Sequence, residues 1–80
     1  MNMNQKMPVS ERALVQRINR RLSEQGRAGR QLRKSRRDGE YWLVDLGMNA
    51  VIERPPIDLE DLGRKLHALA PYEALVRENR

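Results

Sequence analysis

The segment from residue 27 to residue 37 carries the side chains best suited to contact another molecule. It reads RAGRQLRKSRR and holds six cations with no acidic residue among them: Arg27, Arg30, Arg33, Lys34, Arg36 and Arg37. Cations this close together repel one another and cannot be buried without partners. The segment is therefore expected either to stay solvated or to bind a polyanion. Guanidinium groups suit bidentate contacts to phosphate and guanine.

The charge of the whole chain is distributed unevenly. Residues 1–37 hold eleven Lys or Arg against two acidic residues, whereas residues 38–80 hold five against nine, and the net charge is +5. This asymmetry is typical of proteins with a basic face for nucleic acid or a membrane surface. Three arginines of a predicted helix extend the basic segment: Arg17, Arg20 and Arg21. We therefore predict a small DNA-binding protein, a regulator or accessory factor, that contacts phosphates through these nine cations.

Duplex DNA is favoured over RNA as the partner. Proteins that read single strands usually offer several exposed aromatic rings, whereas Tyr41 and Trp42 are expected in the core. Two other functions stay open: a module that docks on an acidic protein, and an RNA-binding protein. A basic surface that binds nothing and stays solvated is the third alternative.

Catalytic, metal-binding and membrane-spanning motifs are not predicted. The chain has one His, no Cys, no Thr and three Ser, and no Ser stands beside an evident base, so we do not expect an enzyme. Neither a cofactor, a metal nor a small-molecule substrate is expected, because no phosphate-binding loop or ligand spacing is present. No apolar run reaches the roughly 18 residues that span a bilayer. Residues 1–8 also lack the apolar core of a signal peptide, so a cytoplasmic location is expected.

The N-terminal half predicts a disordered lead followed by a helix. Residues 1–8 are polar and aperiodic, as in a disordered segment. Ser10 suits the N-cap of a helix, and Gly26 suits its end. The apolar residues between them recur at helical spacing and form one stripe: Leu14, Val15, Ile18 and Leu22.

The middle of the chain predicts a hairpin. Asp38-Gly39 is a favoured pair for two-residue hairpin turns, so residues 31–37 are expected to pair with residues 40–46. A mobile arginine-rich arm over residues 27–37 is the alternative.

Tyr41–Val44 is the clearest strand, and its continuous apolar run predicts cover on both faces. A turn at Gly47–Asn49 and a returning strand at Ala50–Ile52 are expected to follow.

The C-terminal half predicts two more helices. Asp58 suits an N-cap, and a helical stripe follows it: Leu59, Leu62, Leu66 and Leu69. Gly63 within this helix costs about 1 kcal/mol relative to Ala, which indicates close contact with a neighbour. Pro71 is expected to begin a short last helix that reaches residue 76, and residues 77–80 are expected to fray.

Together these elements predict a single α+β domain over residues 9–76. The expected order is helix, two or three antiparallel strands, helix and a short C-terminal helix, with the helices on one face of a small sheet. Eighty residues supply little core, and without Cys no disulfide can stabilise it. A homodimer is therefore expected.

Two pairs of segments carry a resemblance to a known group of proteins. They are SERALVQRINRRL with QLRKSR, and YWLVDLGMNAVI with DLEDLGRKLHALAPYEAL. The chain resembles small uncharacterised accessory proteins of proteobacterial plasmids and integrative elements over roughly residues 10–76. The resemblance implies a setting in the maintenance or regulation of mobile DNA, and it brings no site residues.

Overall fold

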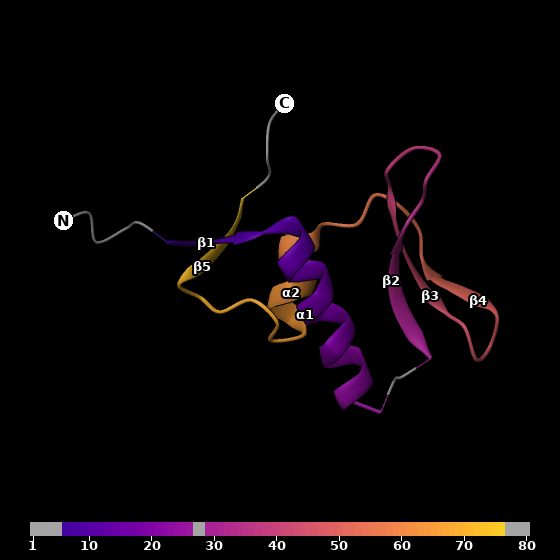
Figure 1. Ribbon diagram of the computed structural model, residues 1–80. Helices are drawn as coiled ribbons and strands as arrows, with labels where there is room; N and C mark the ends of the chain where they lie inside the picture. Colours follow the sequence, from indigo (N-terminus) through magenta and orange to yellow (C-terminus); the bar gives the residue numbers. More distant parts are fainter. Residues whose placement is uncertain (1–5, 27–28, 77–80) are drawn as a thin grey trace.

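The described part of the chain forms two helices, a three-stranded antiparallel sheet and a separate parallel pair of strands (Figure 1). The computed structural model describes residues 6–26 and 29–76. Its elements are β1 (Met7–Ser10), α1 (Glu11–Glu24), β2 (Arg30–Lys34), β3 (Tyr41–Asp45), β4 (Ala50–Glu53), α2 (Leu59–Lys65) and β5 (Glu73–Val76). The α+β class is therefore confirmed. The predicted fraying of residues 77–80 and disorder of residues 1–5 lie outside the described residues.

Helix α1 follows the sequence prediction closely. The Ser10 hydroxyl accepts a hydrogen bond from the Ala13 N–H at 3.1 Å, so Ser10 is the N-cap. Leu14, Ile18 and Leu22 are buried. The helix ends at Glu24, and Gly26 turns the chain away with a φ of +75°.

Strands β2 and β3 pair as an antiparallel hairpin, so the strand interpretation holds for residues 30–34 and the mobile arm is wrong there. Leu32 lies opposite Leu43 in the register. The predicted two-residue turn is also wrong. The Ser35 N–H donates to the Glu40 carbonyl at 2.8 Å, which leaves a four-residue loop with positive φ at Gly39 and not at Asp38. Asp38 instead accepts a hydrogen bond from the Glu40 N–H at 3.0 Å.

Strand β4 returns along β3, as predicted, after a turn in which Asn49 has a φ of +53°. The pairing of β3 with β4 shifts register between Leu43 and Val44. The strand ends at Glu53, just before the cis Pro55-Pro56 bond. Proline has no N–H to donate to a sheet, so the strand does not continue through these two residues.

Helix α2 begins as predicted but is shorter than its leucine pattern indicated. Asp58 caps it by accepting a hydrogen bond from the Asp61 N–H at 3.0 Å. The helix ends at Lys65, because His67 adopts a left-handed φ of +59° and the Ala68 N–H donates back to the Gly63 carbonyl. Leu69 is nevertheless buried, because this turn folds it back onto the core.

The ends of the described chain differ most from the prediction. Residues 73–76 form strand β5 rather than a helix, and Met7 and Pro8 belong to β1 rather than to a disordered lead. The two strands pair in parallel, with Val9 opposite Leu75. Pairing with a strand more than sixty residues away outweighs the local preference for a helix after Pro71.

The hydrophobic core lies between α1, α2 and the inner face of the sheet. Its buried members are Val9, Leu14, Ile18, Leu22, Leu32, Leu43, Leu59, Ala68 and Leu69. The Asn19 amide of α1 hydrogen-bonds both the N–H and the carbonyl of Leu32, at 2.8 and 3.3 Å. Helix α1 thus lies along the outer edge of β2, and β4 is the far edge of the sheet (Figure 1).

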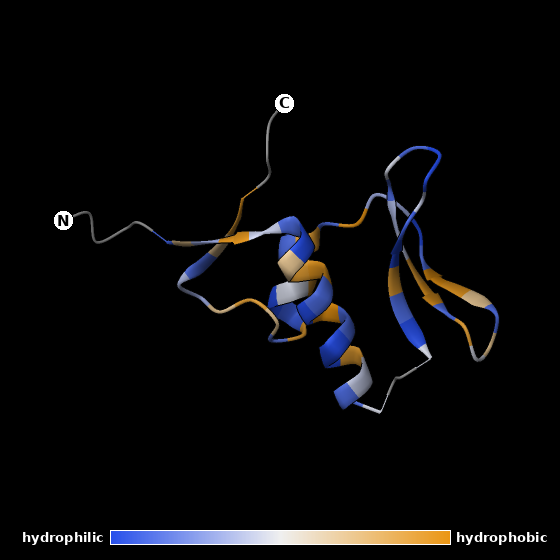
Figure 2. Cartoon of the chain, in the orientation of Figure 1, coloured by the Kyte–Doolittle hydropathy of each residue, from blue (hydrophilic) through white to orange (hydrophobic). Residues whose placement is uncertain are grey.

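The two aromatic residues of β3 point to opposite faces of the sheet. Tyr41 packs against the core, as expected. Trp42 lies on the outer face and is not part of the core, so that expectation is wrong for Trp42. Within this chain Trp42 and Val44 are only partly buried, so cover on both faces of the strand stays a prediction that needs a partner chain. Figure 2 shows the contrast between hydrophobic β4 and the hydrophilic loop between β2 and β3.

Candidate nucleic-acid interface

The hairpin formed by β2 and β3 brings three of the predicted cations to the surface. Arg33 lies on the outer face of β2, opposite Trp42, and Arg36 and Arg37 lie in the loop at the tip. All three are exposed, and their guanidinium groups contact no acidic residue within residues 6–26 and 29–76. We name Arg33, Arg36 and Arg37 the hairpin arginines.

Two other cations of the same strand are paired within the protein. Arg30 lies 3.6 Å from the Asp45 carboxylate across the strand pair, and Lys34 lies 3.6 Å from Glu11 of α1. The Lys34 ammonium also lies 5.6 Å from the centre of the Tyr41 ring. Both side chains point to the inner face of the sheet. Because each lies beside a carboxylate of the same chain, its charge is already partly neutralised in the free protein.

Two of the three helix arginines hold the C-terminal segment in place. One terminal nitrogen of Arg17 donates to both oxygens of the Glu73 carboxylate, at 2.9 and 3.0 Å. The Nε of Arg21 donates to the Leu66 carbonyl at 3.0 Å. The Ala70 N–H and the Arg17 guanidinium, both hydrogen-bonded to Glu73, hold the pKa of this carboxyl below its ordinary value. Arg17 and Arg21 therefore have structural roles.

Arg20 is exposed but lies away from the hairpin loop. It is nine residues along α1 from Glu11, about 13 Å at the rise of an α-helix, and Glu11 is the residue that contacts Lys34 beside that loop. Arg27 lies outside the described residues. The structure therefore brings together the three hairpin arginines and leaves Arg20 apart from them.

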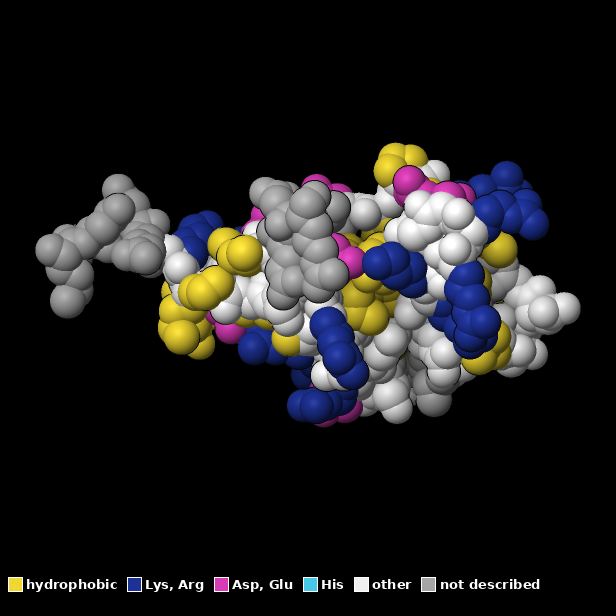
Figure 3. Space-filling view, turned by 45° about the horizontal axis from the view of Figure 1, so that its top comes forward, with side chains coloured by type: hydrophobic (Ala, Val, Ile, Leu, Met, Phe, Trp, Pro, Cys, Tyr) yellow, Lys and Arg dark blue, Asp and Glu magenta, His cyan; other side chains and the backbone are white. Residues whose placement is uncertain are grey.

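The surface distribution of charge agrees with this division. Figure 3 shows Lys and Arg side chains in several separate groups, with uncharged and hydrophobic atoms between them. The expected single basic surface is therefore broken on this face.

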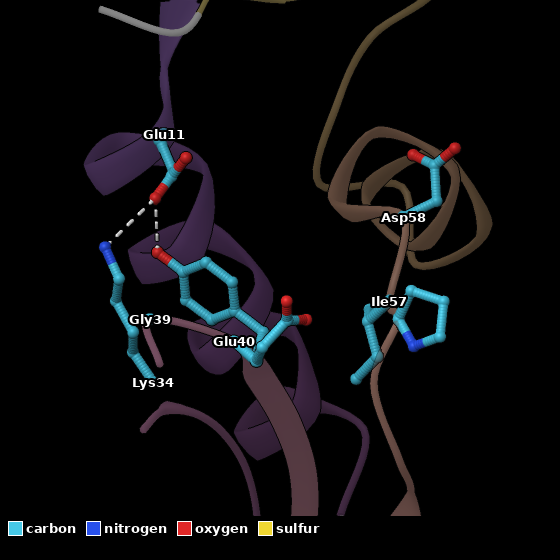
Figure 4. Close-up of a pocket in the computed structure, with 8 residues that line it drawn as sticks. Glu11, Lys34, Gly39, Glu40, Ile57 and Asp58 are labelled. Carbon is cyan, nitrogen blue, oxygen red and sulfur yellow. Dashed lines mark hydrogen bonds and ion pairs between the residues drawn. The ribbon is translucent and has the colours of Figure 1, made fainter. Parts of the chain in front are cut away.

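A cavity of about 620 Å³ lies on the inner side of the hairpin. Figure 4 shows Glu11, Glu40 and Asp58 around it, with Lys34 on one wall. Glu11 also accepts a hydrogen bond from the Tyr41 hydroxyl at 2.7 Å. Three carboxylates beside one ammonium make the cavity unfavourable for phosphate. A polyanion is therefore expected on the loop and the outer face rather than here.

A smaller hollow of about 320 Å³ lies between α1 and the hairpin. Arg12 and Lys34 line it together with Tyr41. Arg12 was not among the predicted site residues. Arg12 lies seven residues from Asn19 and therefore on the same face of α1, but only the structure shows that Asn19 bonds β2, so the sequence held no signal for Arg12.

Other kinds of site find no support in the part of the chain that the structure describes. Residues 6–26 and 29–76 contain no group of three or more His, Cys, Asp or Glu side chains that could hold a metal ion. No helix within these ranges is long and apolar enough to cross a bilayer. Comparison of the chain with protein-family models, curated proteins and solved structures finds no match.

Proposed function

We propose that this chain binds DNA through the hairpin arginines. The observation that carries the proposal is that three guanidinium groups on one hairpin are exposed and have no carboxylate partner among the described residues. Each phosphate they contact releases condensed counterions, which is the main source of backbone affinity. A two-stranded ribbon also fits the major groove of duplex DNA. A role as a regulator or accessory factor of mobile DNA, which the sequence resemblance implies, is compatible with such binding.

The other predicted cations contribute less to this proposal. Arg17, Arg21, Arg30 and Lys34 already contact carboxylates or carbonyl groups. Moving one of them to a phosphate would break a contact within the protein, which offsets part of the gain. The expected footprint of the hairpin is therefore three phosphates for each chain. Arg20 lies apart from it, and Arg27 lies outside the described residues.

We further propose that two chains associate through β1 and β5. These strands form a sheet of only two members, and three exposed apolar side chains lie on or beside them: Met7, Tyr72 and Val76. The pair lies at the opposite end of the molecule from the hairpin (Figure 1). A dimer formed there leaves the hairpins of both chains accessible to DNA. Two linked hairpins on the same DNA bind it more tightly than a single hairpin does.

Sedimentation tests the dimer. Tyr72→Glu should lower the apparent mass at micromolar concentration. The control Met48→Glu should not, although Met48 is similarly exposed, at 73% against 63% for Tyr72. A wild-type protein that sediments as a single chain at about 100 μM would exclude a dimer of functional strength.

Fluorescence anisotropy of a labelled DNA duplex tests the binding. At 0.1 M salt, the double variant Arg36→Gln/Arg37→Gln should bind about 60-fold more weakly, because it loses two contacts that act by counterion release. The matched control is Lys6→Gln/Lys65→Gln, which removes the same charge at exposed positions away from the hairpin. It should bind within about 3-fold of wild type. Equal losses in the two variants would mean that affinity follows net charge alone, and the hairpin would not be the site. An RNA duplex of the same sequence, titrated alongside, separates DNA from RNA.

A further inference from the structure

The outer face of the sheet carries the only tryptophan of the chain, beside an arginine that has no acidic partner among residues 6–26 and 29–76. Trp42 lies on the central strand β3, directly opposite Arg33 on β2 in the register. Side chains opposite one another on paired strands lie about 5 Å apart. Arg33 is exposed and Trp42 is partly exposed. An aromatic ring and a guanidinium group are thus presented side by side on an open sheet.

The surroundings of this pair are mostly uncharged. Strand alternation places Gln31, Val44 and Val51 on the same face as Trp42 and Arg33. A hollow of about 220 Å³ beside Arg33 is lined in part by Val44 and Val51. Asp45 lines this hollow as well, and its carboxylate lies 3.6 Å from Nε of Arg30. Because Arg30 partly neutralises Asp45, a phosphate at Arg33 meets less repulsion here than an unpaired carboxylate would cause.

Arg36 and Arg37 continue the positive charge from this face to the hairpin tip. The sequence favoured duplex DNA because both aromatic residues were expected in the core, and Trp42 is not there. Stacking a base on an aromatic ring between cations that hold the backbone is how proteins bind unpaired strands. In a duplex, the bases are already stacked on one another and cannot reach the ring.

We propose that the outer face binds an unpaired stretch of DNA, with a base stacked on Trp42 and the flanking phosphates at the hairpin arginines. This inference rests on the proposed DNA binding and names the form of DNA that the same hairpin prefers. A segment that holds an unpaired base, such as a single strand or a gap, binds more tightly than an uninterrupted duplex.

The single tryptophan makes the test direct. Wild-type protein is titrated with a 12-nucleotide oligothymidylate and, separately, with a 12-base-pair duplex, while the emission of Trp42 and the anisotropy of a label on the DNA are followed. The oligothymidylate should quench Trp42, and the duplex should not. Trp42→Leu should bind the oligothymidylate about 5- to 150-fold more weakly, the usual effect of removing one stacking ring. It should bind the duplex within about 3-fold of wild type.

Two control variants show whether the effect is specific to the Trp42 ring. Met48→Ala removes a side chain that is 73% exposed in the turn between β3 and β4, and it should alter neither affinity. Trp42→Phe keeps a ring on the strand, and should retain most of the affinity if Trp42→Leu fails to fold. The quenching measurement itself needs no variant.

The outcomes that overturn the inference are distinct. If the oligothymidylate binds through Arg36 and Arg37 but leaves the Trp42 emission unchanged, the base is not stacked there and the proposed DNA binding stands. If neither form of DNA binds, both proposals fail. If Trp42 in the free protein is shielded from acrylamide and the protein is dimeric, a second copy covers this face and the inference is wrong.

Discussion

Gly63 is the position where the packing of the two helices can be tested most sharply. A Cβ atom added to Gly63 would lie 2.8 Å from Cδ1 of Leu14 and 3.3 Å from Cβ of Leu69. Carbon atoms in contact prefer about 3.5–4.0 Å, so the nearer contact must open by roughly 1 Å. Leu14 and Leu69 are 0% and 3% exposed, and neither can move into solvent.

The expected change in stability follows from two opposing effects. Overpacking of this kind costs about 1–3 kcal/mol. Replacing Gly by Ala within a helix returns about 1 kcal/mol through backbone entropy. The net loss for Gly63→Ala is therefore about 1 kcal/mol, a large part of the roughly 3–5 kcal/mol that a core of this size supplies. The melting temperature should fall by about 4–8 °C.

Urea unfolding followed by circular dichroism measures this loss. Gly47→Ala is the matched control, because its added Cβ would meet only Asp45 Oδ1, at 3.4 Å, and its φ is not positive. That variant should stay within about 0.5 kcal/mol of wild type. A Gly63→Ala protein as stable as wild type, or more stable, would refute the close approach of α1 and α2 at this residue.

Two further predictions concern the contacts that hold the sheet and the C-terminal segment. Asn19→Ala should lower the free energy of unfolding by about 1–3 kcal/mol, because the Leu32 N–H and carbonyl lose their partners. The control is Gln16→Ala on the exposed face of α1. If Asn19→Ala loses no more stability than this control, the Asn19 hydrogen bonds do not hold β2 against α1. The lowered pKa of Glu73 means that its stabilisation is fully present above the ordinary Glu pKa of about 4.3 and is lost as the pH falls through the lower folded value. The stability difference between wild type and Glu73→Gln should therefore shrink below about pH 4.3, and a difference that stayed constant from pH 6 to pH 3 would contradict this role.

The parts of the fold that the sequence predicted are those decided locally. Ser10 and Asp58 cap their helices through bonds to residues three positions away. The apolar run at Tyr41–Val44 lies in strand β3, which is five residues long. Each of these depends on neighbours in the chain, so the pattern contains the information.

The parts that were missed depend on distant partners. Residues 73–76 follow a proline that suits a helix start, yet they pair with Met7–Ser10. Asp38-Gly39 suits a two-residue turn, but the register of β2 with β3 ends at Lys34 opposite Tyr41 and leaves a longer loop. The leucine spacing could not reveal that His67 ends α2 and that Leu69 is buried by a turn.

The candidate site was predicted in part for the same reason. The run of cations in the sequence was enough to predict the hairpin arginines, because an exposed cation can stay solvated without a partner in the protein. Arg17 and Arg30 were grouped with them, although Glu73 and Asp45 neutralise them from far along the chain. No local rule shows which carboxylate will fold back onto which arginine.

The salt dependence of DNA affinity tests the central claim most directly. If the three hairpin arginines each contact one phosphate, a plot of log affinity against log salt for a single chain has a slope of about −2.7. Raising salt from 50 to 200 mM then weakens binding about 40-fold. We expect the triple variant Arg33→Gln/Arg36→Gln/Arg37→Gln to bring this slope close to zero. A variant that keeps the wild-type slope, or a wild-type protein that does not bind DNA at 50 mM salt, would contradict it.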